Sequence, residues 1–176
     1  MSTDSSVNFG LPRTGLHEEA PVPEIPFSTT LLVRDCCLCL HVQRAARVLA
    51  RRFDTALKPV GLTNGQFSLL MSLNRPIAPG VPLATVGNVA ELLGMDRTTL
   101  TAAARVLHTR DLLTVESEVG DRRSKVLRLT AEGRRVLAVA LPIWTREHEL
   151  MEAEMEATGT QPGRFRKSLV GLGGRG

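Results

Sequence analysis

Tyrosine is absent from this 176-residue chain, aromatic residues make up only 3% of it, and cysteine occurs three times. Cys36, Cys37 and Cys39 are an odd number bunched within one helical turn, so they cannot form the disulfide framework of a small secreted fold. In a reducing cytosol they remain thiols. No apolar run is long enough for a transmembrane helix, and residues 1–30 lack a basic start followed by an apolar stretch. We therefore expect a cytoplasmic protein with no membrane partner.

Charge of one sign is not in large excess either. The net charge of +4 indicates only a mild preference for an anionic partner. Residues 1–30 carry four acidic residues and one arginine, whereas residues 121–128 carry three arginines and one lysine against a single acid. A small, dense cationic patch suits phosphate groups better than positive charge spread over a surface. The sequence therefore predicts that residues 121–128 contact an anion.

The first half of the chain predicts an arm followed by helices. Residues 1–30 are rich in serine, proline and glycine and predict a flexible or extended arm. A long helix is expected from about residue 36 to 57, where apolar residues recur at three- and four-residue steps with arginines between them. A second helix is expected to begin at Thr63, which can form a capping box with Gln66. A short helix is expected over about 86–93.

A further helix is predicted over residues 97–110, directly after the short helix. Gly94 ends the first of the pair, and Asp96 can cap the second. Apolar residues recur along one side of residues 97–110, while arginine, threonine and alanine occupy the other side. Two short helices joined by such a turn have the form of a helix-turn-helix, although ordinary helical hairpins share this pattern.

The continuation favours a DNA-binding domain. Residues 112–116 predict a strand, 118–124 a turn and 125–129 a returning strand in which apolar and basic residues alternate. A helix fits the major groove, and a basic hairpin tip can insert a guanidinium into the narrower minor groove, where the potential is most negative. We expect Arg123 to be the inserted side chain, oriented by Asp121. The candidate DNA-contacting residues are Arg97, Thr98, Thr99, Thr101, Ala102, Arg105, Asp121, Arg122, Arg123, Ser124 and Lys125.

The C-terminal part predicts two more helices. A long helix is expected from Ala131 to about Glu156, and Pro142 inside it should kink or break it just upstream. A last short helix is expected over 161–172. The two long helices, residues 36–57 and 131–156, carry more apolar surface than a single small lobe can cover. This surplus favours a homodimer.

Together these elements predict a mainly α-helical fold with a small β-hairpin wing. We expect a flexible arm over residues 1–30 and a single domain over residues 31–176. Within that domain, the winged helix-turn-helix lobe covers about residues 62–130. Long N- and C-terminal dimerisation helices flank the lobe, over about residues 36–57 and 131–172.

Several motifs resemble the MarR family of bacterial regulators. The segment AELLGMDRTTL at residues 90–100 resembles that family's helix-turn-helix. The segment GDRRSK at residues 120–125, followed by LTAEG at 129–133, resembles its wing and the exit into the next helix. The segment LPIW at residues 141–144 resembles a recurrent feature of the long penultimate helix. The resemblance covers about residues 36–156.

This resemblance implies an obligate dimer whose terminal helices interleave and whose two winged domains face a palindromic operator in double-stranded DNA. Its half-sites would lie about one helical turn, roughly 34 Å, apart. The resemblance also implies a repressor that a small-molecule effector or an oxidant releases from DNA. A candidate effector pocket where the winged lobe meets the dimerisation helices is formed by His41, Arg44, Phe67, Met71 and Trp144.

The cysteines leave an alternative open. A thiol-based redox or electrophile sensor could use Cys36, Cys37 and Cys39, either as a DNA-binding regulator or as a thiol protein that does not bind DNA. The peroxide-sensing branch of the family holds its reactive sulfur with tyrosine hydroxyls, which this chain lacks. A winged domain used only for protein contact is a third alternative. No second cysteine pair completes a zinc site, and no catalytic constellation stands out, so we predict no metal, no cofactor and no enzyme.

Overall fold

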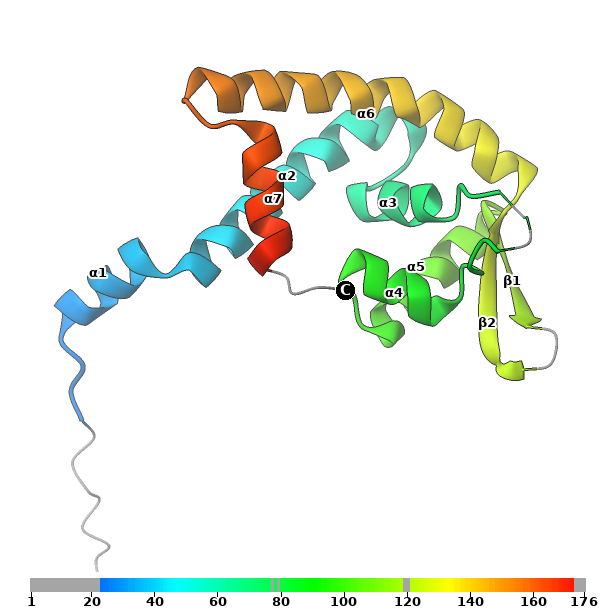
Figure 1. Ribbon diagram of the computed structural model, residues 1–176, viewed down its shortest axis with the longest axis horizontal. Helices are drawn as coiled ribbons and strands as arrows, with labels where there is room; N and C mark the ends of the chain where they lie inside the picture. Colours follow the sequence, from blue (N-terminus) through cyan, green and yellow to red (C-terminus); the bar gives the residue numbers. More distant parts are fainter. Residues whose placement is uncertain (1–22, 77, 79, 119–120, 173–176) are drawn as a thin grey trace, which may run out of the picture. The chain divides into compact units, whose positions relative to one another are not determined.

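The computed structural model describes residues 23–76, 78, 80–118 and 121–172, without the side chains of residues 118 and 121–123. The chain divides into two compact units, Met1–His41 and Val42–Gly176 (Figure 1). Most of the predicted arm, residues 1–22, lies outside the described residues.

The first unit contains helix α1 (Phe27–Cys36) and the first residues of helix α2 (Leu38–Leu57). Helix α1 begins within the range predicted to be an arm, so the first helix starts earlier than expected. Its residues are exposed or only partly covered and none is buried, so they show no apolar periodicity from which a helix could be predicted. The single helix predicted over 36–57 is also interrupted, because Cys37 adopts an extended conformation with φ −73° and ψ 101°.

The second unit continues with the rest of α2 and four further helical segments. These are the 3₁₀ helix η1 (Lys58–Val60), α3 (Asn64–Ser72), α4 (Val86–Leu93) and α5 (Arg97–Thr109). The predicted capping box of α3 is confirmed, because the Thr63 side chain accepts a hydrogen bond from the Gln66 amide while the Gln66 side chain accepts one from Thr63. Gly94 ends α4 in the left-handed region at φ 62°, as a glycine at this position can without strain.

A two-stranded antiparallel hairpin follows α5. Strand β1 (Leu113–Glu118) pairs with β2 (Asp121–Leu129) from Leu113 opposite Leu129 to Ser117 opposite Lys125, and the register then shifts so that Glu118 lies opposite Asp121. The turn predicted over 118–124 is therefore wrong, since its second half belongs to β2. Strand pairing is made by backbone groups, so a run of polar residues can join a ladder without any alternation in its side chains. On its other edge, β2 bonds the segment before α4, because the Leu127 amide donates to the Ala84 carbonyl at 2.9 Å.

Two helices complete the second unit, α6 (Ala131–Ala157) and α7 (Pro162–Leu172). Of the kink or break predicted at Pro142, the break is absent, because α6 is continuous through this residue, and Figure 1 shows that the helix is curved. The first turn of α6 packs against the base of the hairpin. A Cβ on Gly133 would lie 2.0 Å from the Leu112 carbonyl oxygen, so only glycine allows this approach.

The core of the second unit lies between α3, α4, α5, the hairpin and α6. Its largest completely buried side chains are those of Leu57, Leu69, Leu70, Leu100, Leu107, Leu113, Leu127 and Val89. Arg52 of α2 is ion-paired with Glu147 and Glu154 of α6, which hold its pKa above the usual range, and donates to Glu154 through Nη2 at 2.9 Å. The predicted fold class, mainly α-helical with a small β-hairpin, is confirmed.

Candidate nucleic-acid interface

The N-terminus of α5 is fixed by its cap. The Asp96 carboxylate accepts the Thr99 amide at 2.8 Å and the Thr99 hydroxyl at 2.5 Å. These hydrogen bonds, with the hydroxyl contributing most, lower the pKa of Asp96 below its usual value. The cap sets where α5 begins and therefore which of its side chains face outward. The hydroxyl of Thr99, predicted to contact DNA, is engaged in this cap.

The outward face of α5 carries the other predicted helix residues. Each of these residues is exposed, and together they line one shallow groove: Arg97, Thr98, Thr101, Ala102 and Arg105. The Thr101 hydroxyl donates to the Arg97 carbonyl at 2.7 Å, which holds the side chain against the helix. This face combines two guanidinium groups with small side chains, so the helix backbone can approach a flat partner closely.

A second, larger hollow joins α5 to the hairpin. It measures about 820 Å³ and contains Arg97 and Thr101 on one side and Ser124 and Lys125 of β2 on the other. Because Arg97 and Thr101 also line the groove on α5, the two hollows adjoin each other, and together they are called the concave surface. The structure therefore brings together residues that the sequence placed in two separate elements.

The hairpin contributes one well-defined cation to this surface. Lys125 is exposed, and its Nζ donates to the Ser117 hydroxyl of β1 at 2.8 Å, while Ser124 is half-buried. Asp121, Arg122 and Arg123 belong to β2, but their side chains lie outside the described residues.

Sequence reasoning missed the α4 side of the concave surface. Thr85, Asn88 and Glu91 line the hollow beside Arg97. Asn88 is anchored at both ends, since its amide donates to Thr85 Oγ1 at 3.2 Å and its Nδ2 donates to the Leu83 carbonyl at 3.1 Å. The cap motif Thr85-x-x-Asn88 was the available signal, because it fixes the start of α4 next to α5.

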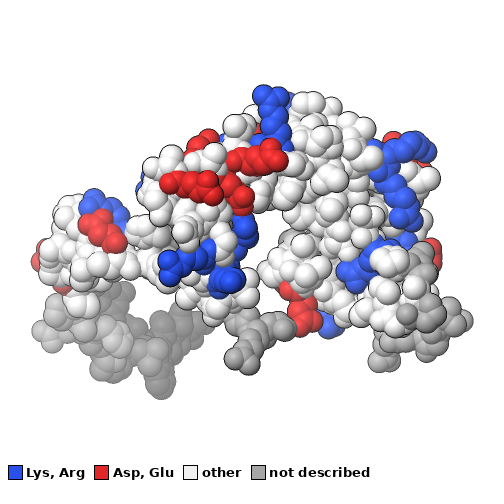
Figure 2. All heavy atoms as spheres, turned by 45° about the horizontal axis from the view of Figure 1, so that its top comes forward, with Lys and Arg blue, Asp and Glu red and all other residues white. Residues whose placement is uncertain are grey.

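Acidic residues are concentrated in the second half of α6. Figure 2 shows acidic side chains gathered over the second half of this helix with basic side chains beside them, and further basic side chains at the hairpin end. The acidic residues of this half are Glu147, Glu149, Glu152, Glu154 and Glu156. Three of these acids are ion-paired, Glu147 and Glu154 with Arg52 and Glu152 with Arg166.

Three of the five predicted effector-pocket residues lie together. Phe67, Met71 and Trp144 line an apolar pocket of about 330 Å³ between α3, α4 and α6. The rings of Phe67 and Trp144 are stacked with centroids 5.8 Å apart. Arg44 does not line this pocket, and His41 belongs to the first unit. The remaining lining residues are Ser68, Ser72, Leu92, Leu93 and Leu141.

The cysteines all lie in the first unit. Cys36 and Cys39 are exposed, and Cys37 is partly covered. The ring of His41 lies next to them, with Nδ1 at 2.8 Å from the Cys37 carbonyl oxygen. Within the described residues, no group of three or more histidine, cysteine or acidic side chains could hold a metal ion, and no described helix is long and apolar enough to cross a membrane.

Comparisons with known proteins place this arrangement in a family. A family model described as MarR family matches residues 60–124, which contain α3, α4, α5 and β1. A search of curated proteins gave no match. Many solved structures are similar.

Three of these structures illustrate the likeness. The M. tuberculosis transcriptional regulator MosR, solved in complex with DNA, is 35% identical, with 78% of this chain and 93% of that chain covered and a TM-score of 0.65. The transcriptional repressor CouR, bound to a 23-mer DNA duplex, is 27% identical, with 85% and 96% covered and a TM-score of 0.60. CouR from Rhodococcus jostii RHA1 bound to p-coumaroyl-CoA matches at 20% identity, with 75% and 88% covered and a TM-score of 0.61, which supports the fold alone.

The family model, the MosR match and the winged lobe agree with one another. The mainly helical chain with its antiparallel hairpin has the winged-helix fold of these proteins. The chain therefore belongs to the MarR family of DNA-binding transcriptional regulators.

Proposed function

We propose that this protein is a dimeric repressor that binds a palindromic operator in double-stranded DNA and has no enzymatic activity. The observation that carries the proposal is the concave surface shared by α5 and the hairpin. Helix α5 enters the major groove and presents Arg97, Thr98, Thr101 and Ala102 to base edges. The hairpin follows the adjacent minor groove, where Lys125 and Arg128 meet phosphates and Arg123 is inserted.

A homodimer follows from the exposed apolar side chains of the terminal helices. In α7, Phe165, Val170 and Leu172 are 41%, 71% and 61% exposed. In α1, Phe27 and Leu32 are 72% and 62% exposed. A chain with this much exposed apolar surface at its two ends gains free energy by covering it with a second copy. Two copies related by a two-fold axis present two α5 helices, which matches a palindromic site.

The experiment that tests the proposal is fluorescence anisotropy with the intergenic DNA next to the protein's own gene. Affinity should fall steeply as salt rises, because each phosphate contact releases a counterion. Arg97→Ala should weaken binding by about tenfold or more. Arg146→Ala, which removes an exposed arginine from α6 far along the helix from the hairpin, serves as the matched control. The absence of salt-sensitive binding would contradict the proposal.

We propose that the effector that releases the protein from DNA binds in the pocket lined by Phe67, Met71 and Trp144. Its walls are apolar apart from Ser68 and Ser72, so the effector we expect is a largely uncharged, apolar molecule. The pocket lies between α6 and the helix-turn-helix, so an occupant changes how the two pack. The measurement is the quenching of Trp144, the only tryptophan of the chain, on addition of candidate compounds.

A thiol sensor is the second candidate, and the exposure of Cys36 and Cys39 favours it. Oxidation needs a sulfur that a peroxide or electrophile can reach. DNA binding is measured before and after peroxide treatment, for the wild type and for a variant carrying Cys36→Ser, Cys37→Ser and Cys39→Ser. A response that survives in the triple variant excludes the cysteines as the sensor.

A further inference from the structure

We propose that Gly87 of α4 is a positioning residue for Arg97, because the missing side chain at position 87 fixes where the Arg97 guanidinium lies when it meets DNA. This inference rests on the DNA binding proposed above. Gly87 is the second residue of α4 and lines the same hollow as Arg97. A Cβ on Gly87 would have Nη2, Cζ and Nε of Arg97 as its three nearest neighbours, at 3.4, 3.7 and 3.7 Å. The guanidinium therefore lies directly against the bare backbone of α4.

The guanidinium turns its face, not an N–H edge, toward Gly87. The three guanidinium atoms are nearly equally far from the Cβ position, whereas an approach by the edge between Nε and Nη2 would leave Cζ farther away than both nitrogens. All N–H bonds of a guanidinium lie in its plane. A contact through the face therefore uses none of the five donors of Arg97.

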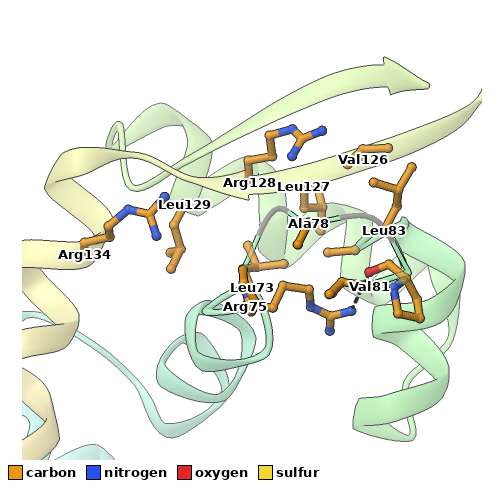
Figure 3. A pocket seen from close by; sticks show the side chains of 13 residues that line it. Leu73, Arg75, Ala78, Val81, Leu83, Val126, Leu127, Arg128, Leu129 and Arg134 are labelled. Carbon is orange, nitrogen blue, oxygen red and sulfur yellow. Dashed lines mark hydrogen bonds between the residues drawn. The ribbon is translucent and has the colours of Figure 1, made fainter. Parts of the chain in front are cut away.

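Another arginine of the lobe is held in the opposite way. Arg75 donates to the Ser72 carbonyl through Nε and Nη2, at 3.1 and 2.8 Å, and to the Pro82 carbonyl through Nη1 at 3.2 Å (Figure 3). Arg75 is thus oriented by hydrogen bonds that occupy its donors. The Arg97 guanidinium makes no hydrogen bond to the other described residues, so its donors stay available for phosphate oxygens or base edges.

No acid orients Arg97 either. Among the described residues, the acids that line the same hollow are Glu91 and Asp96, and neither forms an ion pair with Arg97. The Asp96 carboxylate is engaged with the amide and hydroxyl of Thr99. The packing of the guanidinium on Gly87 is therefore the contact that restricts it, and a side chain restricted in advance loses less entropy when it binds DNA.

A second glycine in the lobe provides an internal comparison. Helices α3 and α4 both follow a threonine cap, and both have glycine as their second residue, Gly65 and Gly87. Neither glycine has a positive φ, so the backbone requires glycine at neither position. A Cβ on Gly65 would meet nothing within 4 Å, whereas one on Gly87 would meet Arg97. Substitution of the two glycines therefore separates an effect on the helix from an effect on Arg97.

The experiment is a double-mutant cycle on the affinity for the intergenic DNA next to the protein's own gene, measured by fluorescence anisotropy. Gly87→Val adds two γ-methyl groups next to the guanidinium and should weaken binding about fivefold. The double variant Gly87→Val/Arg97→Ala should bind as weakly as Arg97→Ala alone, because the valine then has no guanidinium to displace. Gly87→Leu, whose side chain a helix accommodates more readily, should give the same non-additive cycle.

Gly65→Val is the matched control, because it makes the same substitution at the same helix position in open space. It should leave the affinity for DNA unchanged. The melting temperature of each variant, followed by circular dichroism, should not fall below that of the wild type, because valine and leucine favour a helix more than glycine does.

Additive losses in the cycle, wild-type affinity in Gly87→Val, or an equal loss in Gly65→Val each overturn the positioning role while the wild type still binds DNA. A wild type without salt-sensitive DNA binding overturns the proposed function as well. The two failures are therefore distinguishable.

Discussion

The winged lobe and helix α1 differ in where their apolar side chains lie. In the lobe, Leu100 and Leu107 of α5 and Leu113 of β1 are completely buried. Helix α1 buries none of its residues and leaves Phe27 and Leu32 mostly exposed. A single copy therefore accounts for the hydrophobic stability of the lobe, whereas in the proposed dimer a second copy covers the exposed apolar side chains of α1.

Among substitutions that distinguish the lobe from α1, the largest change is expected at Gly133 in the lobe and concerns the free energy of unfolding. Gly133→Ala places a Cβ 2.0 Å from the Leu112 carbonyl oxygen, so α6 must move away from the hairpin. We expect a loss of about 3 kcal/mol in the free energy of unfolding, measured by denaturant titration. Gly163→Ala in α7, where a Cβ meets nothing within 4 Å, should be neutral or stabilising. Equal losses would contradict the close approach.

The next effect concerns α1. Leu32→Ser should weaken the proposed homodimer by about 2 kcal/mol, roughly 30-fold in dissociation constant, if a second copy buries this side chain as proposed. Analytical ultracentrifugation measures this change. Val106→Ser on α5, where the wild-type residue is 48% exposed, is the control and should leave the dimer unchanged. A dimer that tolerates Leu32→Ser would remove α1 from the interface.

A smaller effect, on the affinity for DNA, is expected from a substitution in the hairpin. Arg123→Ala should weaken operator binding by about tenfold, equivalent to about 1.4 kcal/mol, while the free energy of unfolding stays unchanged. Anisotropy titrations at two salt concentrations should also give a shallower salt dependence. Unchanged affinity would exclude a role for this side chain and leave Lys125 as the hairpin's contact.

The smallest effect is expected at the start of α3. Thr63→Ala removes the side-chain acceptor of the Gln66 amide and should lower the free energy of unfolding by about 1 kcal/mol. Thr63→Ser retains a hydroxyl at the same place and should recover most of that loss. Thermal unfolding followed by circular dichroism measures both variants.

The difference in burial between the winged lobe and α1 also explains which parts of the fold could be predicted from the sequence. Where a helix buries one side in its own chain, as α5 does through Leu100 and Leu107, sequence periodicity reports it, and the caps at Thr63 and Asp96 mark the starts. Helix α1 was missed because it has no buried side to produce that periodicity. The length of β2 was missed because the register shifts between Ser117 and Glu118, and an irregularity of this kind leaves no alternation in the sequence.

The candidate site was predicted unevenly for a related reason. Exposed side chains on α5 follow from helical geometry, so Arg97, Thr101 and Arg105 could be assigned to one face from their spacing. The engagement of Thr99 with Asp96 could not, because a hydroxyl can either cap or contact a partner. The contribution of Asn88 depends on how α4 packs beside α5, which no local pattern specifies.

The attachment of α6 to the hairpin has a mechanical consequence. Thr130 donates its hydroxyl to the Asp111 carbonyl at 2.6 Å and its amide to the Leu112 carbonyl at 3.3 Å, one turn before Gly133. The 27 residues of α6 span about 40 Å, so a rotation of about 5° around this joint displaces the distal end by about 3.5 Å. Conversely, a small displacement of the distal end of α6 changes the angle between α6 and the hairpin.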